Sequence, residues 1–104
     1  MQKHTEIYML ALGYDETDFI PSEISGEKAV DIAHISARGM GGNPIKDKDR
    51  IENLMAQTRE EHLRLGDKKE FMVYQYETHR QFLSDNGVSF DNKYFEHKIR
   101  QYGN

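Results

Sequence analysis

Two histidines and an asparagine are spaced along the middle of the chain in a pattern that could support hydrolytic chemistry. His34 lies near the end of the strand-like apolar segment 29–35, and a glycine-rich stretch follows it. Asn53 stands at the start of the next apolar segment, and His62 lies in the helix-forming sequence after it. An imidazole titrates near neutral pH, so it can accept a proton from water or bind a metal ion. Taken singly, each of these residues is more often structural, so only their combination is informative.

Helices and strands must position these side chains, and the first half of the sequence predicts several. Residues 5–12 favour a short helix, although alternating apolar residues there also permit a strand. Residues 14–27 are rich in Asp, Ser and Gly and predict a loop. A second long loop is expected from Gly39 to about Arg50, and a loop of that length is usually functional or disordered. Residues 53–58 suit either a strand or the first turn of a helix.

The second half of the chain is predicted to be largely helical. Residues 59–65 form a good helical sequence, and a longer helix is expected over about 67–84, with Asp67 as its N-cap. Residues 85–104 are aromatic and charged without a clear period, so we expect them to form a C-terminal tail. Together these elements predict one α+β domain over residues 1–104.

Composition limits the class of protein. The chain has 104 residues, of which 37% are hydrophobic and 31% charged, with a formal net charge of -4. It has no cysteine, which excludes disulfides, thiolate zinc sites and cysteine nucleophiles. No apolar run is long enough for a membrane span or a signal peptide, so we expect a cytoplasmic protein with no membrane partner. The negative charge argues against indiscriminate nucleic-acid binding but permits a local basic strip at Arg38, Lys46, Lys48 and Arg50.

The blocks DIAHISARGMGG, DRIENL and TREEHLRLGD resemble the motif of the HNH endonuclease family, and in particular of its small phage and prophage members. The resemblance covers about residues 19–70. It implies a ββα-metal finger with helices on both flanks. It also implies that His34 is the general base, that Asn53 holds the long loop against the second strand, and that His62 is a metal ligand. Hydrolysis of a phosphodiester bond needs such a base and a cation that absorbs negative charge.

Ala33 departs from the family pattern, which places a metal-ligating His or Asp beside the general base. A methyl group cannot bind a metal, so one expected ligand is missing, and we expect metal binding and activity to be weakened. Asp31, two residues away on the same strand face, is the possible substitute. Either the chain is a naturally degenerate nuclease, or a histidine has been replaced by alanine; the otherwise intact motif favours replacement.

The resemblance implies one divalent cation, which could be Mg²⁺ or Mn²⁺, or a softer ion such as Zn²⁺ or Ni²⁺ because the ligands include imidazole. Many relatives also carry two Cys-x-x-Cys pairs that hold a structural zinc. The matching positions here are Ser22, Ser25, Thr58 and Glu61. Hydroxyls are poor zinc ligands compared with thiolates, so we expect no structural zinc.

Three further histidines, His4, His79 and His97, have no ligand spacing to one another and are expected to be structural or exposed. His79 shares a helical face with Met72 and Tyr76, which indicates the core or an interface rather than catalysis.

The function implied by the resemblance is metal-dependent cleavage of nucleic acid, most directly DNA, in a bacterial cell and with a phage or prophage origin. The basic residues of the long loop would contact the phosphate backbone without reading sequence. A homodimer is one way for a single-site enzyme to cut both strands. Two alternatives stay open. Ala33 and the net charge favour a degenerate finger that binds DNA without cutting it, and the aromatic C-terminal residues favour a protein-interaction domain.

Overall fold

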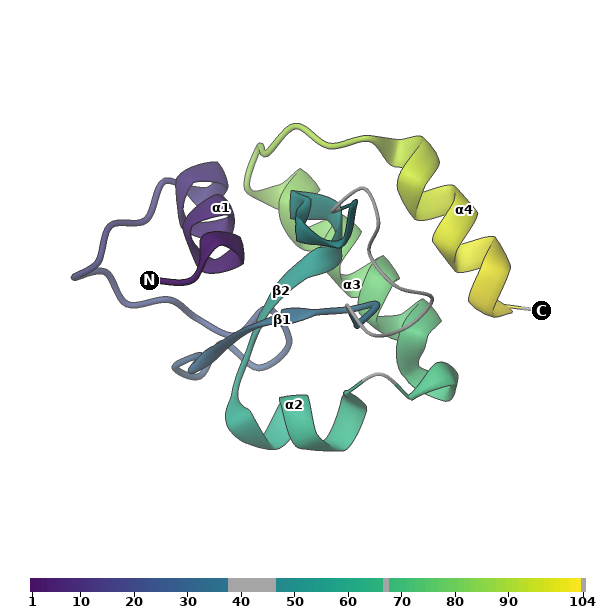
Figure 1. Ribbon diagram of the computed structural model, residues 1–104, viewed down its shortest axis with the longest axis horizontal. Coiled ribbons are helices and arrows are strands. Elements are labelled where there is room, and N and C mark those ends of the chain that lie inside the picture. The colour runs from purple at the N-terminus through teal and green to yellow at the C-terminus, as the bar shows by residue number, and fades with distance from the viewer. Residues whose placement is uncertain (38–46, 67, 104) are drawn as a thin grey trace.

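A computed structural model describes residues 1–37, 47–66 and 68–103 of the chain. This part contains four α-helices and one two-stranded antiparallel sheet, which confirms the α+β class. The order is α1 (Lys3–Leu12), β1 (Asp31–His34), β2 (Leu54–Gln57), α2 (Arg59–Leu65), α3 (Met72–Asp85) and α4 (Asn92–Gly103) (Figure 1). Short 3₁₀ turns lie at Asp47–Asp49, Ile51–Asn53 and Lys69–Phe71.

The two strands pair in a register that sets which side chains share a face. His34 lies opposite Leu54, and Ala33 lies opposite Met55. Directly opposed residues of an antiparallel pair point to the same face of the sheet, and neighbours along a strand point to opposite faces. His34 is therefore on the face of Leu54, whereas Ala33 and Asp31 are on the face of Met55.

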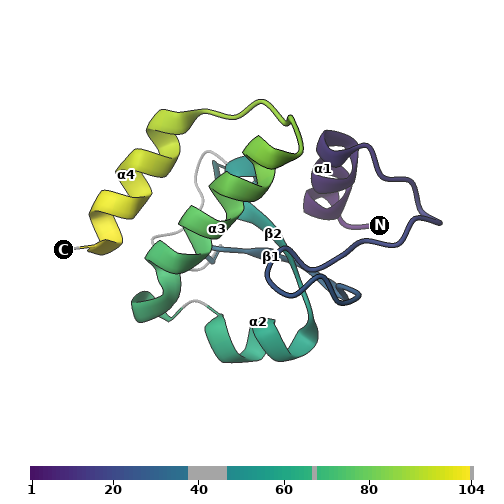
Figure 2. The same ribbon diagram turned by 180° about the vertical axis from the view of Figure 1, so that it is seen from behind.

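Helices cover both faces of this small sheet. On one face Leu54 and Ala56 pack with Tyr8 of α1. On the other, Met55 belongs to a core that α3 and α4 complete, whose buried members are Ile35, Met55, Met72, Tyr76, Leu83, Tyr94 and Phe95. Figures 1 and 2 show α1 on one side of the strands, α3 and α4 on the other, and α2 beyond the end of the hairpin. Every residue of β2 is buried, as expected for a strand covered on both faces.

The helix expected over residues 5–12 is confirmed by α1. Of the two structures that residues 53–58 suited, the strand is the one observed, as β2. The helix expected over 67–84 begins only at Met72, after a 3₁₀ turn, and its proposed cap Asp67 lies outside the described residues. In the described ranges, no helix is both long and apolar enough to cross a bilayer.

The prediction of an irregular tail over residues 85–104 was wrong, because most of that segment is the helix α4. Phe95, Ile99 and Tyr102 recur at intervals of four and three residues, which places them on one helical face. That face packs against the core beside α3. The charged residues between these positions obscured the helical period in the sequence.

A buried hydrogen-bonded pair, Glu23 and His79, joins the loop after α1 to α3. Nδ1 of His79 lies 2.6 Å from a carboxylate oxygen of Glu23, and both side chains are fully buried. The hydroxyl of Tyr8 donates to the other carboxylate oxygen at 2.7 Å. Nε2 of His79 lies 2.6 Å from the carbonyl oxygen of Ile51; a carbonyl can only accept, so Nε2 carries a proton. The prediction that His79 belongs to the core is confirmed.

Candidate functional site

A cleft runs along β1 and α2, and we call it the β1 cleft. Its lining residues are Asp31, His34, Ala37, Arg59, His62, Leu63, Gly66 and Lys68. A second hollow adjoins it and shares four of these residues, adding Gln2, His4, Ile32 and Ala33. The structure therefore brings Asp31, His34 and His62, which the sequence analysis singled out, to one place.

His34 is held at the end of β1 by a carboxylate that comes from the 3₁₀ turn before β2. Its Nε2 lies 2.8 Å from Oδ1 of Asp49, and the two side chains are only 14% and 10% exposed. With Asp49 ionised, Nε2 must carry the proton of this hydrogen bond, so in the neutral imidazole the lone pair is on Nδ1. The ring of His4, from α1, lies against that of His34 with centroids 4.4 Å apart. His34 is thus fixed in orientation from two sides.

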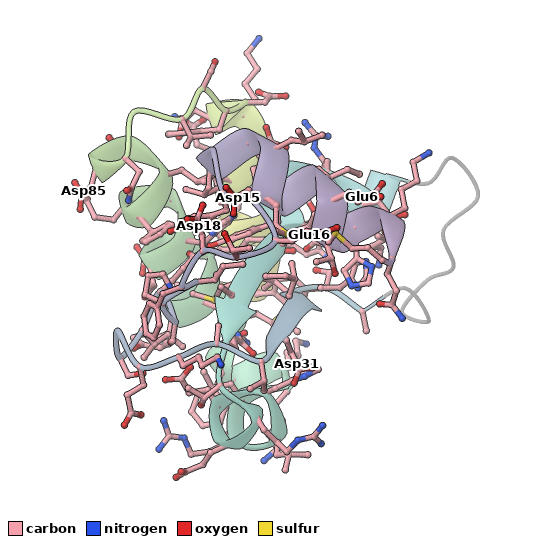
Figure 3. The ribbon with its side chains drawn as sticks, turned by 90° about the vertical axis from the view of Figure 1, so that its left-hand side faces the viewer. Glu6, Asp15, Glu16, Asp18, Asp31 and Asp85 are labelled. Carbon is pink, nitrogen blue, oxygen red and sulfur yellow. The ribbon has the colours of Figure 1, made fainter. Side chains whose placement is uncertain are left out.

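Asp31 and His62 form a pair on the other face of β1. Oδ2 of Asp31 lies 3.3 Å from Nδ1 of His62, and both side chains are partly exposed. Figure 3 shows Asp31 where β1 begins, toward the end of the molecule that carries α2. One oxygen and one nitrogen at this separation could share a divalent cation as adjacent ligands. Within the described ranges, no three ligating side chains are grouped closely enough to hold a metal ion together.

Ala33 lies between these groups in the sequence and is 5% exposed. By the strand alternation its methyl group is on the same face as Asp31. Any ligand placed at position 33 would therefore be on the side of the sheet that carries the Asp31–His62 pair.

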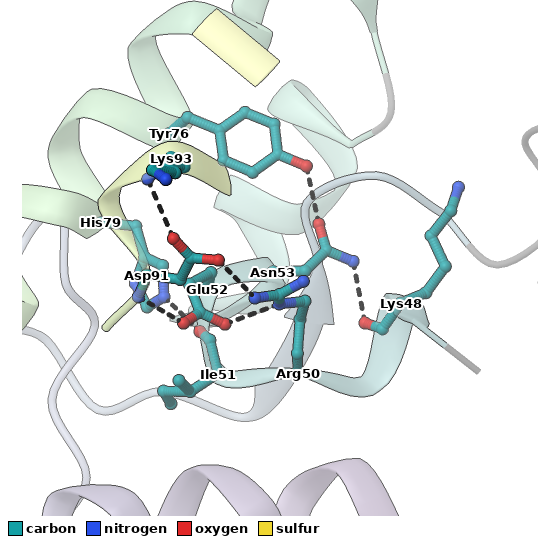
Figure 4. Close-up of polar contacts among 9 residues, drawn as sticks. All are labelled: Lys48, Arg50, Ile51, Glu52, Asn53, Tyr76, His79, Asp91 and Lys93. Atoms are coloured by element: carbon teal, nitrogen blue, oxygen red, sulfur yellow. Dashed lines mark hydrogen bonds and ion pairs between the residues drawn. The ribbon is translucent and has the colours of Figure 1, made fainter. Parts of the chain in front are cut away.

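Asn53 closes the base of the long segment between the strands (Figure 4). Its side chain is completely buried and makes four hydrogen bonds, of which Figure 4 draws those with Lys48 and Tyr76. Nδ2 donates to the carbonyl oxygens of Ser36 at 3.0 Å and Lys48 at 2.9 Å. Oδ1 accepts from the backbone N–H of Ser36 at 2.9 Å and from the hydroxyl of Tyr76 at 2.7 Å. The amide thereby fixes the backbone on either side of residues 37–47 relative to β2.

Tyr76 supports Asn53 from α3. Burial raises the pKa of its hydroxyl well above the usual range, which keeps the hydroxyl protonated and able to donate to Asn53. The hydroxyl also lies 2.5 Å from Oγ of Ser36. The ring of Tyr102 from α4 stacks on that of Tyr76. Side chains of α3 and α4, which lie outside residues 19–70, thus hold Asn53 in place, directly through Tyr76 and indirectly through Tyr102.

The basic residues predicted to contact nucleic acid have different surroundings. Arg38 and Lys46 lie outside the described residues. Lys48 donates through Nζ to the carbonyl oxygen of Ala37 at 3.0 Å. Arg50 pairs with Glu52 at 2.8 Å and Asp91 at 3.4 Å. Its guanidinium also lies over the ring of Tyr94, 4.3 Å from the centroid.

Ser22, Ser25, Thr58 and Glu61, for which the sequence predicted no structural zinc, lie in one hydrogen-bonded region. Oε1 of Glu61 accepts from Oγ of Ser22 at 2.6 Å and from the backbone N–H of Thr58 at 2.8 Å. Oγ1 of Thr58 accepts from the backbone N–H of Glu61, which completes a capping box at the start of α2. Burial acts to raise the pKa of Glu61, but these hydrogen bonds and one from Ser25 outweigh it and lower the pKa. Polar contacts thus link the loop after α1 to α2.

We expect Glu61→Ala to lower the free energy of unfolding by about 1–3 kcal/mol, because Ser22 and Thr58 lose their buried acceptor. Glu60→Ala, an exposed change in the same helix, should stay within about 0.5 kcal/mol of wild type. Urea titration would measure both. Since the pKa of Glu61 is lowered, its contribution is present above the ordinary glutamate pKa and is lost as the pH falls through the lowered value. The cost of Glu61→Ala should therefore shrink on acidification; an equal cost at every pH, or for both variants, would contradict the assignment.

Sequence reasoning missed four residues near the cleft. Asp49 and His4 contact His34, whereas Arg59 and Lys68 line the cleft at opposite ends of α2. For Arg59 and Lys68 there was a signal, since two basic residues bracket the helix that carries His62. His4 gave none, because only tertiary packing of α1 brings it to β1.

Comparison of the chain with protein-family models, with curated protein sequences and with solved structures yields no match. The function is therefore inferred from the residues of the cleft and from the motif they form.

Proposed function

We propose that this chain is a metal-dependent endonuclease of the HNH type that hydrolyses phosphodiester bonds of DNA in the β1 cleft. One observation carries the proposal: β1, β2 and α2 follow one another as in a ββα finger and place Asp31, His34 and His62 around a single cleft. Asn53 lies between the two imidazoles in the sequence and hydrogen-bonds to the backbone of both Ser36 and Lys48.

His34 is the general base in this proposal. Because its Nε2–H is directed to Asp49, the basic nitrogen is Nδ1. Nδ1 takes a proton from a water molecule, whose oxygen attacks the phosphorus atom. The bond from phosphorus to the 3′-oxygen breaks, and the leaving oxygen takes a proton from solvent. The products are a 5′-phosphate and a 3′-hydroxyl, so one water is consumed for each bond cut.

Asp31 and His62 are the residues that would hold a divalent cation, Mg²⁺ or Mn²⁺, or Zn²⁺ or Ni²⁺. Their oxygen and nitrogen atoms, 3.3 Å apart, suit such an ion. A bound cation supplies Lewis-acid stabilisation of the phosphate and of the leaving oxygen. Ala33 contributes no ligand, so the affinity for the cation is expected to be low.

Restoring a ligand at position 33 tests the proposal. We expect Ala33→His to raise the rate at which supercoiled plasmid is nicked by at least about tenfold, because a third ligand would tighten metal binding by about that factor or more. The assay compares both proteins with Mg²⁺, Mn²⁺, Ni²⁺ and EDTA. Cleavage should require the metal in both cases. Thermal unfolding of both proteins checks that the buried site accepts the larger side chain.

A second function is favoured by Ala33 itself, since a site short of a ligand could bind DNA without cutting it. In that case both proteins would bind a duplex with steep salt dependence, which reports phosphate contacts. Neither would nick plasmid, branched DNA or RNA with any of the metals. That result would replace the nuclease proposal with the binding module.

A further inference from the structure

Two basic side chains lie at the two ends of α2 with the catalytic region between them. Arg59 is the first residue of the helix, and Lys68 follows its last residue by three. Both are exposed and both line the β1 cleft together with His34 and His62. In the described part of the chain, neither side chain is engaged in a hydrogen bond or an ion pair. Both cations are therefore available to an anion in the cleft.

Lys48 and Arg50, which the sequence suggested for the same role, are engaged inside the protein. Lys48 donates to the carbonyl oxygen of Ala37. Arg50 pairs with Glu52 and Asp91. A phosphate would have to compete with these contacts, whereas at Arg59 and Lys68 it meets no such competition.

The distribution of charge also points to the α2 end. Four acidic side chains, Glu6, Asp15, Glu16 and Asp18, lie on α1 and the loop after it, and they are exposed. Figure 3 shows them spread over the side of the molecule that α1 and its loop cover, with Asp31 and α2 below them in that view. Like charges repel a polyanion, so DNA is steered away from α1 and toward α2.

We propose that Arg59 and Lys68 bind backbone phosphates on either side of the scissile one, so that the DNA strand runs along α2. This inference rests on the proposed function and adds the path of the substrate to it. A helix of seven residues is about 10 Å long. Phosphates of one strand recur about every 3.4 Å along the duplex axis, so side chains at the two ends of α2 are far enough apart to contact different phosphates of one strand. His62 lies between them, next to Asp31.

The test measures binding separately from cleavage. A short fluorescein-labelled DNA duplex of mixed sequence is titrated with protein in EDTA, and anisotropy is followed at several salt concentrations from about 50 to 200 mM. The variants are Arg59→Gln, Lys68→Gln and the double change. Arg64→Gln is the matched control, since Arg64 is an exposed arginine of the same helix that does not line the cleft. Thermal unfolding checks that each variant folds.

Each cleft variant should weaken binding about five- to tenfold near 0.1 M salt and reduce the slope of log K against log salt by about 0.9. The double variant should lose about twice that slope, and Arg64→Gln should behave as wild type. Unchanged affinity in the cleft variants, or an equal loss in Arg64→Gln, would overturn the proposed path while leaving the nuclease proposal in place. A wild-type chain that neither binds nor nicks DNA would instead overturn the proposed function.

Discussion

Replacing His34 with alanine should lower the rate of plasmid nicking by about a hundred- to ten-thousandfold, the usual contribution of a general base. The physical reason is the loss of the imidazole nitrogen that takes the proton from water. DNA affinity in EDTA should change little, because the imidazole is not one of the cations proposed to hold the phosphates; thermal unfolding measures the separate cost of losing the largely buried contact with Asp49. The comparison is made in the Ala33→His protein if nicking by the parent chain is too slow to measure.

Asp49→Asn tests whether the tautomer of His34 matters for nicking, and not only the position of its ring. The amide can still hydrogen-bond to His34, but its NH₂ group can donate to Nε2 and so favour the wrong tautomer. We expect nicking to fall more than tenfold while binding is kept. His97→Ala removes an exposed imidazole on α4 and should leave nicking unchanged. Full activity in His34→Ala would show that this imidazole is not the base.

Replacing Asn53 with alanine should lower the free energy of unfolding by about 3–5 kcal/mol. The change leaves four hydrogen-bonding groups of Ser36, Lys48 and Tyr76 without their partner, and a buried unsatisfied group costs about 1–3 kcal/mol. A domain of this size has about 5–15 kcal/mol in total, so the variant should be close to unfolding. Urea titration followed by circular dichroism measures the difference.

Two further variants show whether the effect comes from the buried amide. Tyr76→Phe removes one of the four hydrogen bonds and should cost about 1 kcal/mol. Asn92→Ala removes an exposed amide and should cost less than about 0.5 kcal/mol. If Asn53→Ala were no more destabilising than Asn92→Ala, the amide would not be what holds the two ends of the segment together.

The part of the fold that carries the motif was readable from the sequence because its signals are local. The apolar run before His34 indicated a strand and the sequence of residues 59–65 indicated a helix without help from distant residues, whereas residues 53–58 suited either type of element. Antiparallel pairing then follows, since two consecutive strands of this kind commonly form a hairpin. Strand alternation also correctly put Asp31 and Ala33 on one face.

What could not be read from the sequence depends on contacts between distant segments. Asp49 contacts His34 from a segment 15 residues away, where Asn53 hydrogen-bonds to the backbone of both Lys48 and Ser36. The ring of His4 reaches the same histidine because α1 packs across the sheet. No local sequence pattern predicts either contact. His34 could therefore be predicted as a site residue, but Asp49 and His4, which orient its ring, could not.

The buried pair of Glu23 and His79 restricts how this chain can change over generations. Replacing either residue alone leaves the other polar side chain buried without its partner, which costs about 1–3 kcal/mol, whereas a well-packed apolar pair in both places can be nearly neutral. An evolutionary route that alters one position first therefore passes through a less stable intermediate. The two positions should consequently be inherited as a unit, so that relatives of this chain keep both residues or have lost both.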